Sequence, residues 1–312
     1  MAQRRCSTIR ISYLGDNNKY IVGLINFSTL IKRTSGSFIS SRENDWNEHV
    51  ARILDQTRLN IRTNFLLENT IPSLSKQINT LGYNKFRLCI LISNILPHEY
   101  KERIYSAAQS NTWIIIEERD VDGYLDAQGA ISRSLQKSLS DEPNKDNLDN
   151  VTFSSFRLDD DDFLPNDYLS HLSKYITSSN QGKFVTFENG YQGLWNSACN
   201  KIENIITSHR PLIAIGLAHI GGYNYSANGF TTEPATVFAG LSHYDISNKY
   251  SVIHDTTEGM FFWSQHENQD TAGKFKSTQI KEKWNNIPDF VHAMLPRFDF
   301  LKKYFNNSMD YK

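Results

Sequence analysis

The chain has 312 residues, of which 33 are basic and 34 acidic, so its net charge is −1; it is 39% hydrophobic and 12% aromatic. No long basic stripe marks it as a nucleic-acid binder, and its apolar content is enough for a sizeable core. The three cysteines, Cys6, Cys89 and Cys199, are odd in number and far apart, so they indicate neither a disulfide framework nor a zinc site.

No stretch approaches the about 20 apolar residues that a membrane span requires. Residues 1–20 also lack the apolar segment of a signal peptide. We therefore expect a cytoplasmic protein without a membrane span, either free or peripherally attached to the inner face of the membrane.

Buried strands and amphipathic helices alternate through the first half of the chain. Continuous apolar runs predict the strands, and apolar residues at helical spacing predict the helices between them. The expected strands are 20–27, 86–93, 112–117 and 151–156, and the expected helices are 44–60, 62–77, 96–108 and 127–139. Pro72 predicts a kink or a fresh helix start inside the second helix. This alternation is typical of a three-layer α/β fold with a mostly parallel central sheet.

The pattern changes after Ser179 to short apolar segments separated by polar turns, which predict a mixed or antiparallel half. The expected strands are 183–187, 212–219, 236–241, 250–254 and 259–264, and the expected helices are 281–289 and 290–305, with Pro296 interrupting the latter. We expect a single domain over residues 1–305, with two halves that meet near residue 180.

Four consecutive carboxylates, Asp159 to Asp162, come directly after the last strand of the first half; we refer to them as the acidic run. The carboxyl ends of parallel strands form the edge where α/β folds bind ligands. Like charges so close together repel each other, and a divalent cation such as Mg²⁺ or Mn²⁺ would relieve that repulsion. Because side chains alternate along an extended chain, Asp159 would pair with Asp161, and Asp160 with Asp162.

The acidic run has three other interpretations: a solvated loop, an EF-hand and an aspartyl phosphatase nucleophile. A solvated loop is the usual meaning of such a run and stays an alternative. An EF-hand is excluded, because Phe163 stands where an oxygen ligand is required and no glycine follows. An aspartyl phosphatase nucleophile normally follows the first strand, whereas several elements precede this run.

Three blocks of the sequence resemble a known family. The first runs from Arg62 to Gln77 and continues through the strand from Phe86 into Leu96-Pro97-His98-Glu99-Tyr100-Lys101-Glu102-Arg103. The second is Arg157-Leu158-Asp159-Asp160-Asp161-Asp162, and the third is Phe262-Trp263-Ser264-Gln265-His266-Glu267-Asn268, where Glu267 replaces a small residue. Over roughly residues 20–270 the chain resembles GT-A type glycosyltransferases and, more narrowly, the bacterial "putative rhamnosyltransferase" family.

The resemblance implies a GT-A-like fold with two halves. The first half, about residues 20–180, would bind a nucleotide-sugar donor, and the second half, about residues 181–305, would bind the acceptor. It places Asn26 and Phe27 at the nucleotide base. It also implies that the earlier acidic residues, Asp159 and Asp160, face the ribose or the sugar.

The same resemblance implies a divalent metal, Mn²⁺ or Mg²⁺. The expected metal ligands are Asp160, Asp161, Asp162 and, from the second half, His266, whose alternative is a structural role beside Trp263. Arg62 and Arg157 could each hold the diphosphate through the guanidinium fork, although Arg157 could equally be a counter-ion of the acidic run.

An inverting transfer needs a base on the acceptor side. We choose Glu233, with Asp255 as the alternate; a solvated loop position is the alternative for Glu233, and a retaining reaction stays open. Glu188 is expected only to cap a turn, and His254 to be a structural histidine on a strand.

Together these features predict a metal-dependent glycosyltransferase that moves a sugar from a nucleotide-sugar donor to a glycan or lipid-linked glycan acceptor in surface-polysaccharide or lipopolysaccharide-type synthesis. Two alternatives remain. One is a non-catalytic, metal-dependent carbohydrate-binding domain or a degenerate transferase, and the other is a metal-dependent phosphohydrolase.

Overall fold

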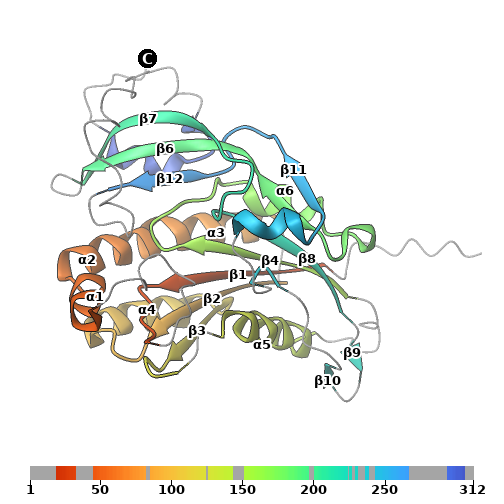
Figure 1. Cartoon of the computed structure of the whole chain (residues 1–312), viewed down its shortest axis with the longest axis horizontal. Coiled ribbons are helices and arrows are strands. Elements are labelled where there is room, and N and C mark those ends of the chain that lie inside the picture. Colours follow the sequence, from red (N-terminus) through yellow and green to blue (C-terminus); the bar gives the residue numbers. More distant parts are fainter. Residues whose placement is uncertain are drawn as a thin grey trace, which may run out of the picture.

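A seven-stranded sheet with one antiparallel member forms the centre of the computed structural model (Figure 1). The structure describes residues 19–32, 45–81, 85–123, 126–142, 151–196, 200–223, 225–226, 229–230, 236–238, 243–266 and 294–305. In sheet order the strands are β11 (Val252–Asp255), β5 (Phe184–Phe187), β8 (Ala218–Tyr223), β4 (Val151–Asp159), β1 (Lys19–Phe27), β2 (Phe86–Ser93) and β3 (Ile114–Arg119). β8 runs antiparallel to β4 and β5, and the other neighbours are parallel.

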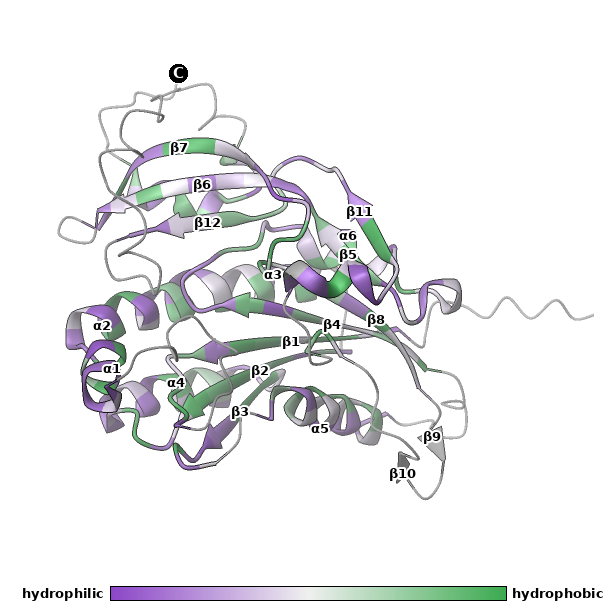
Figure 2. Cartoon of the chain, viewed as in Figure 1, coloured by the Kyte–Doolittle hydropathy of each residue, from purple (hydrophilic) through white to green (hydrophobic). Residues whose placement is uncertain are grey.

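Helices cover both faces of this sheet, because its central strands are apolar on both sides. The helices are α1 (Trp46–Ile53), α2 (Gln56–Phe65), α3 (Ile71–Leu81), α4 (His98–Ser110), α5 (Ala127–Ser140) and α6 (Tyr168–Ser173). α2, α3, α4 and α6 contribute to the core on one face, and α5 to the core on the other. Figure 2 shows apolar residues concentrated on the central strands. The predicted GT-A-like α/β class, with three layers and a mostly parallel sheet, is confirmed.

The segment that joins β1 to β2 is more divided than predicted. The expected helix 44–60 is two helices, because Asp45 caps α1 and Asp55 caps α2 with their carboxylates on backbone N–H groups. α2 continues into a π-helical turn, Leu66–Thr70, where the Ile71 N–H donates to the Leu66 carbonyl five residues earlier. Pro72 follows this turn and has no N–H to offer to an α-helical bond. The predicted irregularity therefore takes the form of a π-helical turn.

A second, three-stranded sheet lies above the large one in the view of Figure 1. It contains β12 (Phe262–Gln265), β6 (Asn189–Asn196) and β7 (Lys201–His209), and a separate short pair is formed by β9 (Tyr225–Ser226) and β10 (Gly229–Phe230). A cluster of mostly aromatic side chains, the ring cluster, joins this sheet to α2 and to the C-terminal segment. Its members are Phe65, Phe163, Tyr191, Trp195, Ile202, Ile205, Phe262, Met294, Phe298, Leu301, Tyr304 and Phe305.

The predicted mixed or antiparallel character of the second half is confirmed, but several of its predicted strands and helices differ from those in the structure. The hairpin of β6 and β7 was not predicted, residues 212–217 are turns before β8, and residues 236–238 are not a strand. The predicted helix 281–289 lies outside the described residues, and in 294–305 the structure has a 3₁₀ helix, Asp299–Tyr304. The single domain over 1–305 stays a prediction. Within the described ranges, no helix combines the length and the apolarity needed to cross a membrane.

Candidate functional site

The acidic run lies where the two central strands of the large sheet end. β4 ends at Asp159, and Asn26, the penultimate residue of β1, is its neighbour in the parallel register. The Asn26 side-chain oxygen is buried and accepts no hydrogen bond from a described residue. The Phe27 ring is fully buried in the core, so of the two residues predicted to contact a base only Asn26 presents a polar atom.

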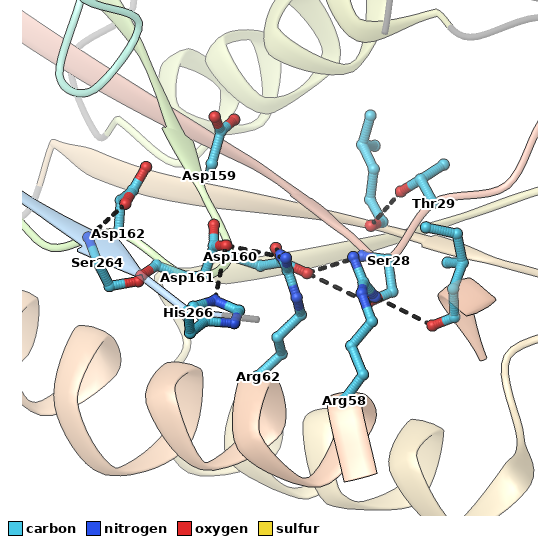
Figure 3. Close-up of polar contacts among 12 residues, drawn as sticks. Ser28, Thr29, Arg58, Arg62, Asp159, Asp160, Asp161, Asp162, Ser264 and His266 are labelled. Carbon is cyan, nitrogen blue, oxygen red and sulfur yellow. Dashed lines mark hydrogen bonds and ion pairs between the residues drawn. The ribbon is translucent and has the colours of Figure 1, made fainter. Parts of the chain in front are cut away.

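Asp160 is held by the end of β1 and by α2 (Figure 3). The Ser28 N–H and hydroxyl both donate to one Asp160 oxygen, at 2.9 and 3.2 Å, and Arg62 donates to the other. Ser28 has a backbone φ of 45°, in the left-handed region that a non-glycine residue seldom occupies. Arg58, one turn before Arg62 on α2, donates to the Ser28 hydroxyl at 2.9 Å. Such strain is typical of sites where a side chain must be held in one position.

Asp161 is the point where the two halves of the chain meet. Its Oδ2 accepts from Arg62 at 2.8 Å and lies 3.2 Å from His266 Nε2, while its backbone carbonyl accepts from the Ser264 hydroxyl. Burial by itself would raise the pKa of the Asp161 carboxyl, but the charge of Arg62 and the hydrogen bond of His266 lower it. The structure therefore brings His266 to the acidic run, as expected, and does so through Asp161.

Asp162 has fewer partners than its two predecessors. Its Oδ1 accepts from the Ser264 N–H at 3.1 Å, and no further hydrogen bond from a described residue reaches this buried carboxyl. Burial, and then the charges of Asp161 and Asp159, raise the pKa of Asp162 well above its usual value. Negative charge is thus least compensated at the last residue of the run.

Asp159 stands apart from the other three carboxylates. Its side chain is 43% exposed and pairs with Arg157 at 3.2 Å, and the Arg157 guanidinium lies 5.5 Å from the centre of the Phe238 ring. The expected alternation of the four side chains is wrong. β4 ends at Asp159, and the Asp162 N–H donates back to the Asp159 carbonyl in a turn, so neighbours such as Asp160 and Asp161 can share Arg62.

Charge and lone pairs decide whether this site suits a divalent metal. Within the described residues, the four carboxylates face three guanidinium groups, those of Arg58, Arg62 and Arg157, which leaves negative charge in excess. A carboxylate can only accept, so in the neutral His266 ring Nε2 carries the hydrogen toward Asp161 and Nδ1 has a lone pair. That nitrogen is buried without a described partner.

No group of three or more His, Cys, Asp or Glu side chains in the described part of the chain forms a metal cage by itself. A cage is not required, because Mg²⁺ commonly uses one or two carboxylates and completes its shell with substrate phosphates and water. Asp162 offers such a carboxylate, and His266 Nδ1 offers a nitrogen ligand.

Of the two predicted bases, the structure describes only Asp255. Glu233 lies outside the described residues. Asp255 ends β11 at the same edge of the sheet, and its oxygens accept from the Tyr175 hydroxyl at 2.6 Å and from the Thr257 N–H at 2.7 Å. Its catalytic role stays a prediction.

Three residues of the site were missed in the sequence. Arg58 carried a signal, because it lies four positions before Arg62 and so on the same helix face. Ser28 and Ser264 carried none, since their contacts depend on how β1 and β12 meet the acidic run.

One family model matches most of the chain. The model of the family described as "Putative rhamnosyl transferase" matches residues 20–278. No curated protein gives a significant match to the sequence.

Solved structures resemble the chain only distantly. They include the inositol-1-phosphate CTP transferase of T. maritima, which is 11% identical with a TM-score of 0.31, over 86% of this chain and 95% of that one. A "putative nucleotide-diphospho-sugar transferase" of Desulfovibrio desulfuricans G20 is 10% identical with a TM-score of 0.29, over 93% and 99%. The nucleoside-diphosphate-sugar pyrophosphorylase of Vibrio cholerae RC9 is 12% identical with a TM-score of 0.28, over 76% and 92%.

Proposed function

The chain belongs to the rhamnosyl transferase family, and from this premise we propose that it is a metal-dependent glycosyltransferase whose donor is a nucleoside-diphosphate sugar. The acceptor we propose is a glycan or lipid-linked glycan of a surface polysaccharide. Rhamnose is the sugar that the family description names. The observation that carries the proposal is the acidic run at the neighbouring ends of β1 and β4, where Arg62 and His266 hold Asp160 and Asp161.

The edge that bears the acidic run offers what a nucleoside diphosphate needs. Asn26 can pair with the base through its unused amide oxygen. The exposed carboxylate of Asp159 suits the ribose hydroxyls, which donate hydrogen bonds to carboxylates. Arg62 and Arg157 are planar donors that match phosphate oxygens in pairs, so either can exchange part of its carboxylate contact for the diphosphate.

Asp162 and His266 would hold the metal, with Asp161 beside them. A divalent ion there would act as a Lewis acid on the departing diphosphate oxygen. The protein itself contributes orientation. The Ser264 N–H fixes Asp162, and Asp161 fixes the His266 ring so that Nδ1 keeps its lone pair.

A thermal-shift screen of UDP, GDP, dTDP and CMP, each with and without Mn²⁺, tests this proposal. A nucleotide at a hundredfold excess over its Kd stabilises the folded state by about 2.7 kcal/mol, which raises Tm by a few degrees. We expect one nucleoside diphosphate to do so only with Mn²⁺.

Replacing Asp162 by Asn should abolish that shift while leaving the Tm of the free protein within a few degrees. Asp122→Asn is the matched control, because Asp122 is an exposed carboxylate paired with Lys32 on the surface. A nucleotide shift that persists unchanged in EDTA, or in Asp162→Asn, would contradict the metal assignment.

A further inference from the structure

A second carboxylate–imidazole pair lies at the carboxyl edge of the large sheet, away from the acidic run. Glu188 directly follows β5, and its Oε1 lies 2.5 Å from Nδ1 of His254 in β11. The Glu188 side chain is 10% exposed and the His254 side chain 45% exposed. A nearly buried carboxylate thus holds a ring that solvent can reach.

The strand register places this pair level with the acidic run. Ala218 of β8 is paired with Phe156 of β4 on one side and with Val185 of β5 on the other. Asp159 and Glu188 each lie three residues beyond this row, on strands that run in the same direction. They are two strand spacings apart, about 10 Å.

The pair and Asp159 also project from the same face of the sheet. Phe156, Val185 and Ile253 pack into one core, and side chains alternate along strands, so His254 and Asp159 project from the other face. Glu188 joins His254 there, and Arg157, the partner of Asp159, lies over Phe238 on that face. The pair thus lies on the face of the sheet from which Asp159 projects, with His254 one strand further from β4 than Glu188.

The chemistry of the pair suits a proton acceptor. A carboxylate only accepts hydrogen bonds, so in the neutral His254 ring Nδ1 carries the hydrogen and Nε2 has the lone pair. Among the described residues, the ring forms no hydrogen bond other than that at Nδ1. Asp255, one residue later, has its carboxylate occupied by the Tyr175 hydroxyl and the Thr257 N–H. A buried carboxylate that fixes an imidazole in one tautomer also stabilises the imidazolium that forms when the base takes a proton.

We propose that His254 is the general base for the acceptor hydroxyl and that Glu188 is its positioning residue; this rests on the proposed function. The acceptor oxygen forms the new bond to the anomeric carbon, and the bond from that carbon to the β-phosphate oxygen breaks. The hydroxyl proton passes to His254 Nε2. The nucleoside diphosphate leaves with the electron pair, and the anomeric configuration inverts.

The test uses the full-length chain with dTDP-, UDP- and GDP-rhamnose as donors and octyl glycosides of glucose, galactose, mannose and rhamnose as acceptors. Release of nucleoside diphosphate is measured, which also counts hydrolysis with water as the acceptor. His254→Asn should lower kcat by about 100-fold or more, the scale of a general base, with the donor KM and the Tm nearly unchanged. Added imidazole should restore part of the activity of His254→Ala, which a structural role would not allow.

His209→Asn is the matched control, because His209 is an exposed histidine whose ring contacts the neutral Asn189, the residue after Glu188. It should keep kcat within twofold of the wild type, and Glu188→Gln should fall between the two histidine variants. A kcat of His254→Asn above one third of the wild-type value, or an equal fall in His209→Asn, overturns the assignment and leaves the transferase function standing. A wild type that neither binds nor consumes any of these donors overturns the proposed function and this assignment together.

Discussion

The two sheets of this protein hold the acidic run by different means. On the side of the large sheet, the contacts are ionic: Arg62 bridges Asp160 and Asp161, and both partners are buried. On the side of the small sheet, the contacts are the hydrogen bonds of Ser264 and His266, and ring packing around the next residue is added to them. Phe163, the next residue after the run, packs at 5.2 Å from Phe65 and pairs with Phe262 through backbone hydrogen bonds. Charge therefore orients the carboxylates, whereas ring packing fixes the loop that carries them.

Removing a ring from the small sheet should have the largest effect on stability. Trp195 is 1% exposed and lies 4.4 Å from the Phe65 ring and 4.5 Å from the Tyr304 ring. Trp195→Ala should lower the free energy of unfolding by about 4 kcal/mol, because it leaves a large cavity. Urea denaturation measures the loss; a change below about 1 kcal/mol would show that rings do not fix this side.

Removing the buried cation should cost somewhat less. Arg62→Met leaves two buried carboxylates without their shared partner, and we expect a loss of about 3 kcal/mol in urea denaturation. The control is Arg157→Met, whose partner Asp159 is largely solvated and whose loss should stay below about 1 kcal/mol. Equal losses in the two variants would contradict the view that burial makes the Arg62 contacts important.

Exposed charges in the first half should matter least. Burial would raise the pKa of Asp126, but hydrogen bonds from Arg133 and the Gly129 N–H outweigh it and lower that pKa. Its contribution to stability is therefore present above about pH 4 and is lost as the pH falls through the lowered folded-state value. Asp126→Asn keeps a capping side chain and should lose slightly less Tm than the wild type between pH 5 and pH 3. A steeper fall in Tm for the variant would reverse the sign of this prediction.

The same contrast explains what the sequence could predict. β1 and β2 of the large sheet contain apolar runs such as Ile21 to Ile25 and Leu88 to Ile92, which the sequence reveals directly. β6 and β7 are amphipathic and contain small or polar residues such as Gly193, where the Phe262 ring occupies the space a side chain would fill. Their stability comes from rings on α2 and the C-terminal segment, which a local pattern does not reveal.

The site shows the same limit. Asp159 to Asp162 and His266 could be selected because their residue types and the family resemblance indicate a metal or nucleotide site. Which donors contact which carboxylate could not be predicted, since these contacts depend on a turn after β4 and on Ser28 at the end of a different strand. The pairing of Glu188 with His254 likewise joins two strands 66 residues apart.

The π-helical turn Leu66–Thr70 sets the angle at which the arginines reach the carboxylates. An α-helix turns by about 100° per residue, and a π turn takes in one residue more than an α turn. The same residues wound as an uninterrupted α-helix would rotate Arg58 and Arg62 by about 100° relative to α3, whose Leu74 and Ile71 are anchored in the core. A sequence change that turns this segment into α-helix without removing a residue would thus swing both guanidinium groups away from the carboxylates, whereas loss of one residue together with the π turn would keep their facing.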